Sequence, residues 1–249
     1  MKGVLLAGGN GTRLRPLTLI TNKHLLNVFD RPLVEYPLAT LTKAGITEIL
    51  IISGREHSGH FVNYLGSGKD RGLKFTYKVQ EEAGGIAEAL GLAEDFIGHE
   101  KFAVILGDNV YEDDFTEEFK IFEKSSDINS VVFIKEVKDP TRFGVVQFSD
   151  PAEDEEVKIE HIVEKPKRPP SPWAVTGLYL YDENAFEIIK TLEPSGRGEL
   201  EITDLNNWYI ENKKMVPAYV TGFWSDAGTF QSMLDSSNWA QQNNGKIKE

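Results

Sequence analysis

The sequence contains no cysteine and no long hydrophobic run. Without cysteine, neither a disulfide nor thiolate chemistry is possible. No apolar stretch approaches the roughly 20 residues that a membrane-spanning helix needs. The apolar run Val4–Ala7 near the N-terminus is too short for the core of a signal peptide. We therefore expect a cytoplasmic protein without a membrane partner.

Basic residues are also scarce relative to acidic ones. Lys and Arg number 27 against 39 Asp and Glu, which gives a net charge of −12. Because nucleic-acid backbones are bound through Lys and Arg, a chain this acidic is not expected to have a nucleic-acid partner. A small anion can still bind where a few basic side chains are concentrated in one place.

The first half of the chain alternates between strand and helix patterns. Strands are predicted at Val4–Ala7, Glu48–Ser53, Lys74–Val79 and Phe102–Leu106, and helices at Leu33–Ala44, Phe61–Leu65 and Ile86–Phe96. This order predicts an α/β, Rossmann-like three-layer fold, with a mainly parallel mixed sheet flanked by helices.

The second half is richer in strands. They are predicted at Ser130–Glu136, Val145–Phe148, Ile159–Val163, Val175–Tyr181 and Val216–Thr221, with helices at Glu183–Thr191, Ile202–Asn212 and Thr229–Gln241. We find no repeats and no low-complexity linker, so residues 1–249 are interpreted as a single domain. Its second half is interpreted as an inserted subregion that carries a second substrate on the same sheet.

Polar residues follow several predicted strands at one edge of the sheet, where open parallel sheets bind ligands. These residues are Gly8 to Arg13, Gln80, Asp108, Glu164 with Lys165, and Asp226. Their convergence is a stronger signal than any one of them alone.

The loop from Gly8 to Arg13 suits phosphate binding, because successive glycines let backbone N–H groups approach phosphate oxygens. The loop lacks the Gly-Lys-Ser/Thr of a P-loop, and Leu14 stands where a dinucleotide fingerprint needs its third glycine. Arg13 can grip two phosphate oxygens at once, and Lys23 can add a second charge. The alternative is a glycine turn with two solvated basic side chains.

Asp108 and Asp226 are candidate Mg²⁺ ligands, since Mg²⁺ takes one or two carboxylates together with phosphate oxygens and water. Each can instead be a turn former or a helix N-cap. Glu164 and Lys165 suit a sugar hydroxyl and a phosphate, or a surface ion pair. Gln80 can read a base edge, although it can also be an ordinary loop residue.

Two further patterns are weaker. His57 and His60 have the spacing of metal ligands, but no third histidine lies nearby, so surface positions are favoured. The triplet Glu112-Asp113-Asp114 resembles a metal-binding acidic motif, but we interpret it as a solvated helix start.

The chain resembles the sugar-1-phosphate nucleotidyltransferases, and among them the glucose-1-phosphate thymidylyltransferases. The resemblance begins with the stretch from Leu6 to Thr18, followed by Lys23. Similar stretches follow in the same order: Gln80 to Ala89, Leu106 to Asn109, Arg142 to Val145, Glu164 to Pro166, Arg197 to Asp204, and Trp224 to Thr229. Together they span essentially the whole chain.

The resemblance implies roles for these residues. The nucleotide-binding residues are Leu6, Gly8, Gly9, Gly11, Thr12, Arg13, Gln80, Gly85 and Asp108. The sugar-phosphate-binding residues are Gly144, Glu164, Lys165, Arg197 and Glu199. Arg13, Lys23 and Asp108 are catalytic, and Asp108 and Asp226 bind Mg²⁺. Residues 1–125 then form a nucleotide-binding half, and residues 126–249 a sugar-phosphate-binding half.

The implied reaction joins glucose 1-phosphate to dTTP, giving dTDP-glucose and pyrophosphate by Mg-dependent in-line attack without a covalent intermediate. The alternative functions are a relative that uses UTP or another sugar phosphate, and a non-catalytic regulatory homologue that binds sugar nucleotides. An NAD-binding oxidoreductase is a weaker alternative. Asn27 replaces a usual proline, and Glu81-Glu82-Ala83-Gly84 replaces a proline-containing segment beside the base site. A homo-oligomer is expected. The C-terminal helical extension of the longer thymidylyltransferases is not expected, so their regulatory site and their tetramer are in doubt for this chain.

Overall fold

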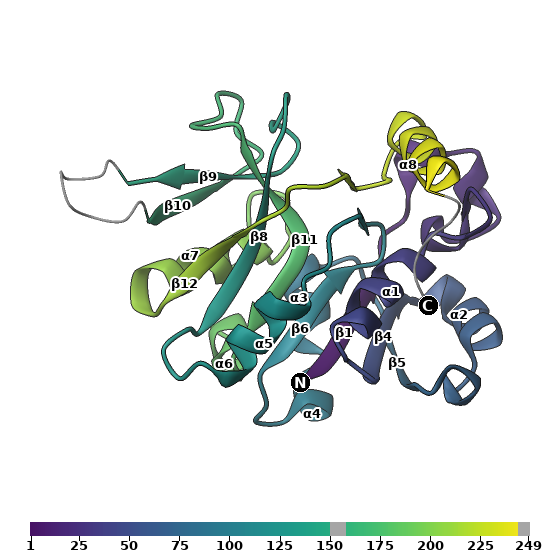
Figure 1. Ribbon diagram of the computed structural model, residues 1–249, viewed down its shortest axis with the longest axis horizontal. Coiled ribbons are helices and arrows are strands. Elements are labelled where there is room, and N and C mark those ends of the chain that lie inside the picture. The colour runs from purple at the N-terminus through teal and green to yellow at the C-terminus, as the bar shows by residue number, and fades with distance from the viewer. Residues whose placement is uncertain (150–157, 244–249) are drawn as a thin grey trace.

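Four parallel strands of the first half form one side of the central sheet. The computed structural model describes residues 1–149 and 158–243 (Figure 1). The four strands are β1 (Lys2–Ala7), β4 (Glu48–Gly54), β5 (Lys74–Gln80) and β6 (Phe102–Leu106), in the order β6-β1-β4-β5. Their residues are mostly buried, as expected for parallel strands covered on both faces.

The second half continues this sheet with antiparallel strands. The strands are β8 (Ser130–Glu136), β9 (Gly144–Phe148), β10 (Ile159–Glu164), β11 (Trp173–Tyr181) and β12 (Met215–Tyr219). β11 pairs antiparallel with β6, β8 and β9, whereas β12 runs parallel to β8. β9 and β10 form a hairpin that extends away from the body of the sheet (Figure 1).

Helices cover both faces of the sheet. One face is packed by α3 (Ile86–Gly91), α4 (Glu94–Ile97), α6 (Asn184–Ile189) and α7 (Ile202–Asn212), and the other by α1 (Glu35–Lys43), α2 (Ser58–Leu65) and α5 (Thr116–Lys124). A third cluster packs α8 (Phe230–Gln242) against the β2–β3 hairpin (Asn27–Val28 and Arg31–Pro32). The predicted three-layer α/β fold is therefore confirmed.

The predicted helix Ile86–Phe96 was wrong in its continuity, because it is split into α3 and α4. The break follows Gly91, a poor helix former. Beside it, Lys78 Nζ donates to the carbonyl of Leu92 at 2.8 Å, which occupies an acceptor that a continuous helix uses internally.

The acidic triplet is not the solvated start of a helix, because α5 begins only at Thr116. Of the three acids, only Asp114 contacts this start, accepting from Thr116 N at 2.9 Å. Asp113 accepts from the backbone of Thr221 and Gly222 at 2.7 to 3.0 Å, and Glu112 accepts from Phe223 N at 2.7 Å. Two of the acids therefore anchor the segment that leads to the short strand β13 (Trp224–Ser225).

Lys101, just before β6, stabilises the end of α5. Its Nζ donates to the carbonyls of Phe122, Ser125 and Ile128 at 2.8, 2.5 and 3.3 Å. Lys101→Met keeps the aliphatic stem but removes these bonds, so we expect the free energy of unfolding to fall by about 2 kcal/mol. Urea denaturation measures this loss. Lys120→Met, which removes an exposed Lys–Glu pair on the same helix, should change stability by less than about 0.5 kcal/mol.

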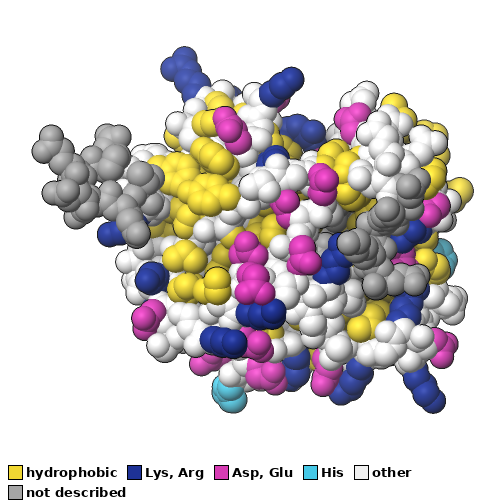
Figure 2. All heavy atoms as spheres, in the orientation of Figure 1, with side chains coloured by type: hydrophobic (Ala, Val, Ile, Leu, Met, Phe, Trp, Pro, Cys, Tyr) yellow, Lys and Arg dark blue, Asp and Glu magenta, His cyan; other side chains and the backbone are white. Residues whose placement is uncertain are grey.

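Basic and acidic side chains are interspersed on the face shown in Figure 2, over the same elements as in Figure 1. Within the described ranges, no helix combines the length and apolar composition needed to cross a membrane. Because the chain is acidic, an anion site must concentrate several basic side chains in one place. The carboxyl edge of the sheet, described next, is the candidate for such a place.

Candidate active site

The glycine loop after β1 lies against two other predicted site residues. A Cβ built on Gly8 would stand 2.7 Å from Gln80 Oε1, and one built on Gly11 would stand 3.2 Å from Lys23 Cβ. Gly9 and Gly11 have φ values of +90° and +56°, which glycine adopts without strain. The loop therefore lies directly against the amide of Gln80 and the side chain of Lys23.

Lys23 and Asp108 form an ion pair at the carboxyl ends of β1 and β6. Burial opposes ionisation of Asp108, but the charge of Lys23 and hydrogen bonds from Lys23 and Asn109 outweigh it, so the pKa of Asp108 is lowered. Burial, reinforced by Lys23, lowers the pKa of the neighbouring His24 to about 3. At neutral pH the site therefore holds an ionised carboxylate, a lysine and a neutral imidazole.

These groups line one open cleft of about 250 Å³. Eight predicted site residues line it: Leu6, Gly8, Gly9, Lys23, Gln80, Gly85, Asp108 and Glu199. His24, which sequence reasoning missed, lines it too, with its Nδ1 held 2.6 Å from Asn22 Oδ1. The only sequence signal for His24 was its position next to Lys23.

Gly85 forms the far wall of the cleft, where α3 begins. Its φ of +105° with a ψ of 174° belongs to a region that is essentially restricted to glycine. A Cβ there would overlap the carbonyl oxygen of Leu200 and lie 2.8 Å from its nitrogen. This close approach joins Gly85 to the segment that carries Glu199, so the two parts of the cleft wall are packed together.

A short ladder brings Asp226 opposite Asn109, the residue that follows Asp108. β7 (Val110–Tyr111) pairs antiparallel with β13 (Trp224–Ser225), with Ser225 opposite Val110. The residue after β13 therefore lies beside the residue before β7. Asp226 also accepts from Arg142 Nη2 at 2.5 Å, and a Cβ on Gly228 would lie 3.4 Å from Asp226 and 3.0 Å from Arg13 Nη2.

Asn109 links Asp108 to the strand β13, which precedes Asp226. Its Nδ2 donates to Asp108 at 2.9 Å. Its Oδ1 accepts from the Trp224 ring at 2.7 Å and from Gly177 N at 3.0 Å. Asn109 and Arg142 lie in two of the stretches that resemble the family, and no other feature of the sequence singles them out.

Glu164 lies beside three other residues that were predicted to bind the sugar phosphate. Its carboxylate contacts Lys165 Nζ at 2.9 Å, Arg197 Nη2 at 3.2 Å and Thr203 Oγ1 at 2.5 Å. A Cβ on Gly144 would lie 3.6 Å from it. Burial opposes ionisation of Glu164, but the Thr203 hydrogen bond and the charges of Lys165 and Arg197 prevail, so its pKa is lowered.

The residues that follow Glu164 and Asp226 have strained backbone conformations. Lys165 and Ala227 are non-glycine residues with φ values of +42° and +34°. Such conformations cost about 1–3 kcal/mol each and cluster at functional sites. Here they follow Glu164 and Asp226 directly, which fits a site that demands particular side-chain directions.

Arg197 and Glu199 link the sugar side to the cleft. Arg197 bonds Glu201 through three nitrogen–oxygen contacts and lies 3.5 Å from Glu199, which itself lines the cleft. Glu164 was expected at this edge because it ends a strand of a parallel sheet, but its strand is not parallel. β10 is antiparallel to β9, and Glu164 reaches the site because it pairs with Gly144.

Among the described residues, the Thr12 side chain forms no hydrogen bond with another predicted site residue. It is exposed and begins the turn η1 (Thr12–Leu14) directly after Gly11. The other predicted residues are linked by the contacts given above, although seven of them do not line the cleft.

A divalent ion would find two carboxylates here rather than a complete cage. In the part of the chain that the structure describes, no cluster of three or more acidic or histidine side chains is arranged to hold a metal. Asp108 and Asp226 nevertheless suit Mg²⁺, because it takes one or two protein carboxylates and completes its shell with phosphates and water. Each carboxylate is paired with a basic side chain, Lys23 or Arg142, that phosphate oxygens could bind instead.

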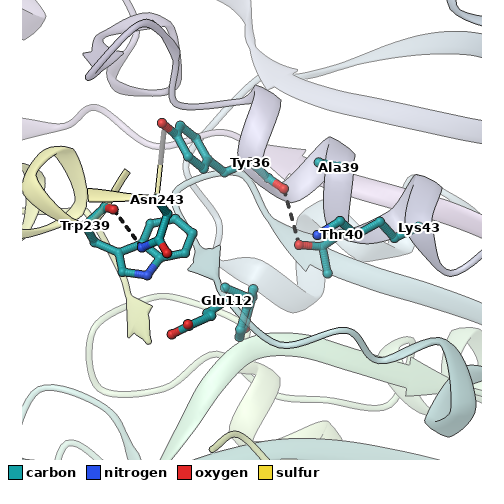
Figure 3. Close-up of a pocket in the computed structure, with 8 residues that line it drawn as sticks. Tyr36, Ala39, Thr40, Lys43, Glu112, Trp239 and Asn243 are labelled. Carbon is teal, nitrogen blue, oxygen red and sulfur yellow. Dashed lines mark hydrogen bonds between the residues drawn. The ribbon is translucent and has the colours of Figure 1, made fainter. Parts of the chain in front are cut away.

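A second cavity, of about 80 Å³, lies between α1, Glu112 and the end of α8 (Figure 3). Tyr36 and Thr40 face it from α1, and Trp239 and Asn243 from the opposite wall. It contains none of the predicted site residues, so the cleft at the carboxyl edge remains the candidate active site.

Comparisons with known proteins agree on one family. The profile of the family described as "Nucleotidyl transferase" matches residues 2–243. Glucose-1-phosphate thymidylyltransferases of Neisseria meningitidis and Mycolicibacterium smegmatis are 44% and 41% identical over 97% of this chain, covering 83% and 82% of their own lengths.

Solved structures give the same result. A Bacillus anthracis protein provisionally named glucose-1-phosphate thymidylyltransferase is 47% identical, with a TM-score of 0.90 over 97% of this chain and 95% of that one. A UDP-glucose pyrophosphorylase bound to UDP-glucose is 27% identical, with a TM-score of 0.85 over 97% and 98%. The chain belongs to the nucleotidyl transferase family.

Proposed function

We propose that this protein transfers the thymidylyl group of dTTP to glucose 1-phosphate, releasing pyrophosphate and forming dTDP-glucose. The observation that carries the proposal is a single cleft in which the glycine loop, the Lys23–Asp108 pair, Gln80 and Glu199 meet. The names of the relatives supply the two substrates. We further propose that the protein acts in the cytoplasm as a homo-oligomer.

The two halves of the chain divide the work. We assign the residues before position 126 to the nucleotide and the later ones to the sugar phosphate. Glu199 contributes to both, because it lines the cleft and lies beside Arg197. Gly144 and Glu164 face the sugar, whose hydroxyls can donate to the Glu164 carboxylate.

The chemistry requires one anion to attack another. An oxygen of the sugar phosphate forms a bond to the α-phosphorus of dTTP. The bond from that phosphorus to the oxygen between the α- and β-phosphates breaks, and this oxygen leaves as a terminal oxygen of pyrophosphate. The attacking phosphate is largely dianionic at neutral pH, so no general base is required. Catalysis is then positioning and charge neutralisation.

The basic side chains of the site supply that neutralisation. Lys165 and Arg197, held around Glu164, bind the attacking phosphate. Arg13, which lies near Asp226, stabilises the charge that builds on the departing pyrophosphate. Lys23 assists at the triphosphate. Mg²⁺ on Asp108 and Asp226 would add positive charge at the α-phosphate.

A pyrophosphate-release assay tests the proposal directly. Purified protein with Mg²⁺ and glucose 1-phosphate should release pyrophosphate fastest with dTTP, among dTTP, UTP, CTP, ATP and GTP. Thymine and uracil present the same imide edge to Gln80, so measurable turnover with UTP is compatible with the proposal. A preference for a purine triphosphate, or turnover only with another sugar phosphate, would refute it.

A further inference from the structure

The amide of Gln80 is held in one orientation by its internal partners. Its Nε2 donates to the carbonyl oxygen of Gly85 at 3.2 Å and to the carboxylate of Glu88. A carbonyl and a carboxylate can only accept, so the nitrogen end of the amide must face them. Gln80 as a whole residue is 7% exposed, so its amide is oriented in a largely buried environment.

The oxygen end of the same amide faces the ligand side of the cleft. Gln80 Oε1 lies over Gly8, where a Cβ would come within 2.7 Å of it. Gly8 and Gln80 both line the cleft. Among the described residues, the hydrogen bonds of this amide all use Nε2 and none reaches Oε1, so the oxygen can accept from a ligand.

A fixed acceptor at this point distinguishes classes of base. Thymine and uracil carry an N–H between two carbonyls, whereas cytosine has a lone pair at the same ring position. An oxygen facing the base attracts the first class and repels the second. If the amide turned over, its N–H groups would face the base and the preference would weaken.

We propose that Glu88 is a positioning residue that sets base specificity, because it locks the Gln80 amide with its oxygen toward the cleft and thereby selects imide bases over cytosine. The inference rests on the proposed function, since it requires the base to lie against Gln80. It assigns a role to a residue that touches no substrate itself.

Glu88 also has a possible structural role that the test must separate. It lies in the first turn of α3, where a negative charge stabilises the helix N-terminus. Any acid at this place would serve the helix. Only a side chain that accepts from Gln80 serves the amide orientation.

The experiment compares Glu88→Leu with Glu88→Gln. In Glu88→Leu only the weaker Gly85 acceptor remains, so the ratio of kcat/KM for dTTP over dCTP should fall by about tenfold or more. Most of that fall should come from a higher KM for dTTP at nearly unchanged kcat. Glu88→Gln still offers a carbonyl oxygen to Gln80 and should restore most of the ratio.

Glu82→Leu is the matched control, because it removes an exposed acid from the same segment without touching Gln80. Its dTTP over dCTP ratio should equal that of the wild type. A folded Glu88→Leu protein with an unchanged ratio would overturn the inference. So would a Glu88→Gln protein as indiscriminate as the leucine variant.

Binding without turnover keeps this test independent of the proposed reaction. Calorimetric titration with dTTP and with dCTP, in the absence of sugar phosphate, should show the same loss of preference in Glu88→Leu. If the wild type binds dTTP but releases no pyrophosphate with glucose 1-phosphate, the proposed function fails while the role of Glu88 is still measured. If Glu88→Leu binds both nucleotides as the wild type does, the role of Glu88 fails alone.

Discussion

Replacing Arg13 with alanine should leave the protein folded and slow nucleotidyl transfer by about 10²–10³-fold. Arg13 is exposed, so its removal leaves no buried group without a partner. Its guanidinium lies beside Gly228, which also adjoins Asp226. The fork of an arginine can hold two oxygens of the leaving pyrophosphate at once.

The measurement is steady-state pyrophosphate release with saturating dTTP and glucose 1-phosphate, together with a thermal melt. Arg15→Ala is the matched control, because Arg15 is also exposed and stands two residues further along the same segment. It should retain most of the activity. An Arg13→Ala protein that is folded and as active as the Arg15 control would remove Arg13 from the mechanism.

Local rules predicted which residues of the first half meet in the cleft. The strands β1, β5 and β6 are parallel and have polar residues at or just after their carboxyl ends, so a rule about strand ends was enough to bring Gly8, Gln80 and Asp108 together. The signal is local because each residue ends the strand that positions it or follows that strand by one or two positions.

The sugar side and the metal side depend on pairings that no local pattern encodes. Glu164 ends an antiparallel strand, and it is placed by its pairing with Gly144. Asp226 is placed by the β7–β13 ladder. Glu112 and Asp113 were misread because their partners are backbone groups more than 100 positions away. Sequence periodicity reports burial and spacing, but it does not report which distant backbone group accepts or donates.

Gly85→Ala should be the most damaging single-methyl change in the site. The backbone conformation of Gly85 strains any other residue by about 1–3 kcal/mol. The added Cβ would also overlap the Leu200 carbonyl oxygen, and overpacking of this kind costs about 1–3 kcal/mol more. We expect the free energy of unfolding to fall by about 3 kcal/mol, measured by urea denaturation.

Gly45→Ala separates strain from overlap. Gly45 also has a positive φ, of +85°, but a Cβ there meets nothing within 4 Å, so its loss should be only about 1 kcal/mol. Equal losses in the two variants would mean that Leu200 yields freely.

The functional effect of Gly85→Ala should reach beyond the base. Leu200 N donates to the Gly84 carbonyl at 2.8 Å, and the Leu200 carbonyl accepts from Ala87 N at 3.2 Å. Displacing Leu200 therefore moves its neighbour Glu199, which lines the cleft and lies beside Arg197. The KM for dTTP and the KM for glucose 1-phosphate should both rise. A rise confined to dTTP would show that the two halves of the site are mechanically independent at this point.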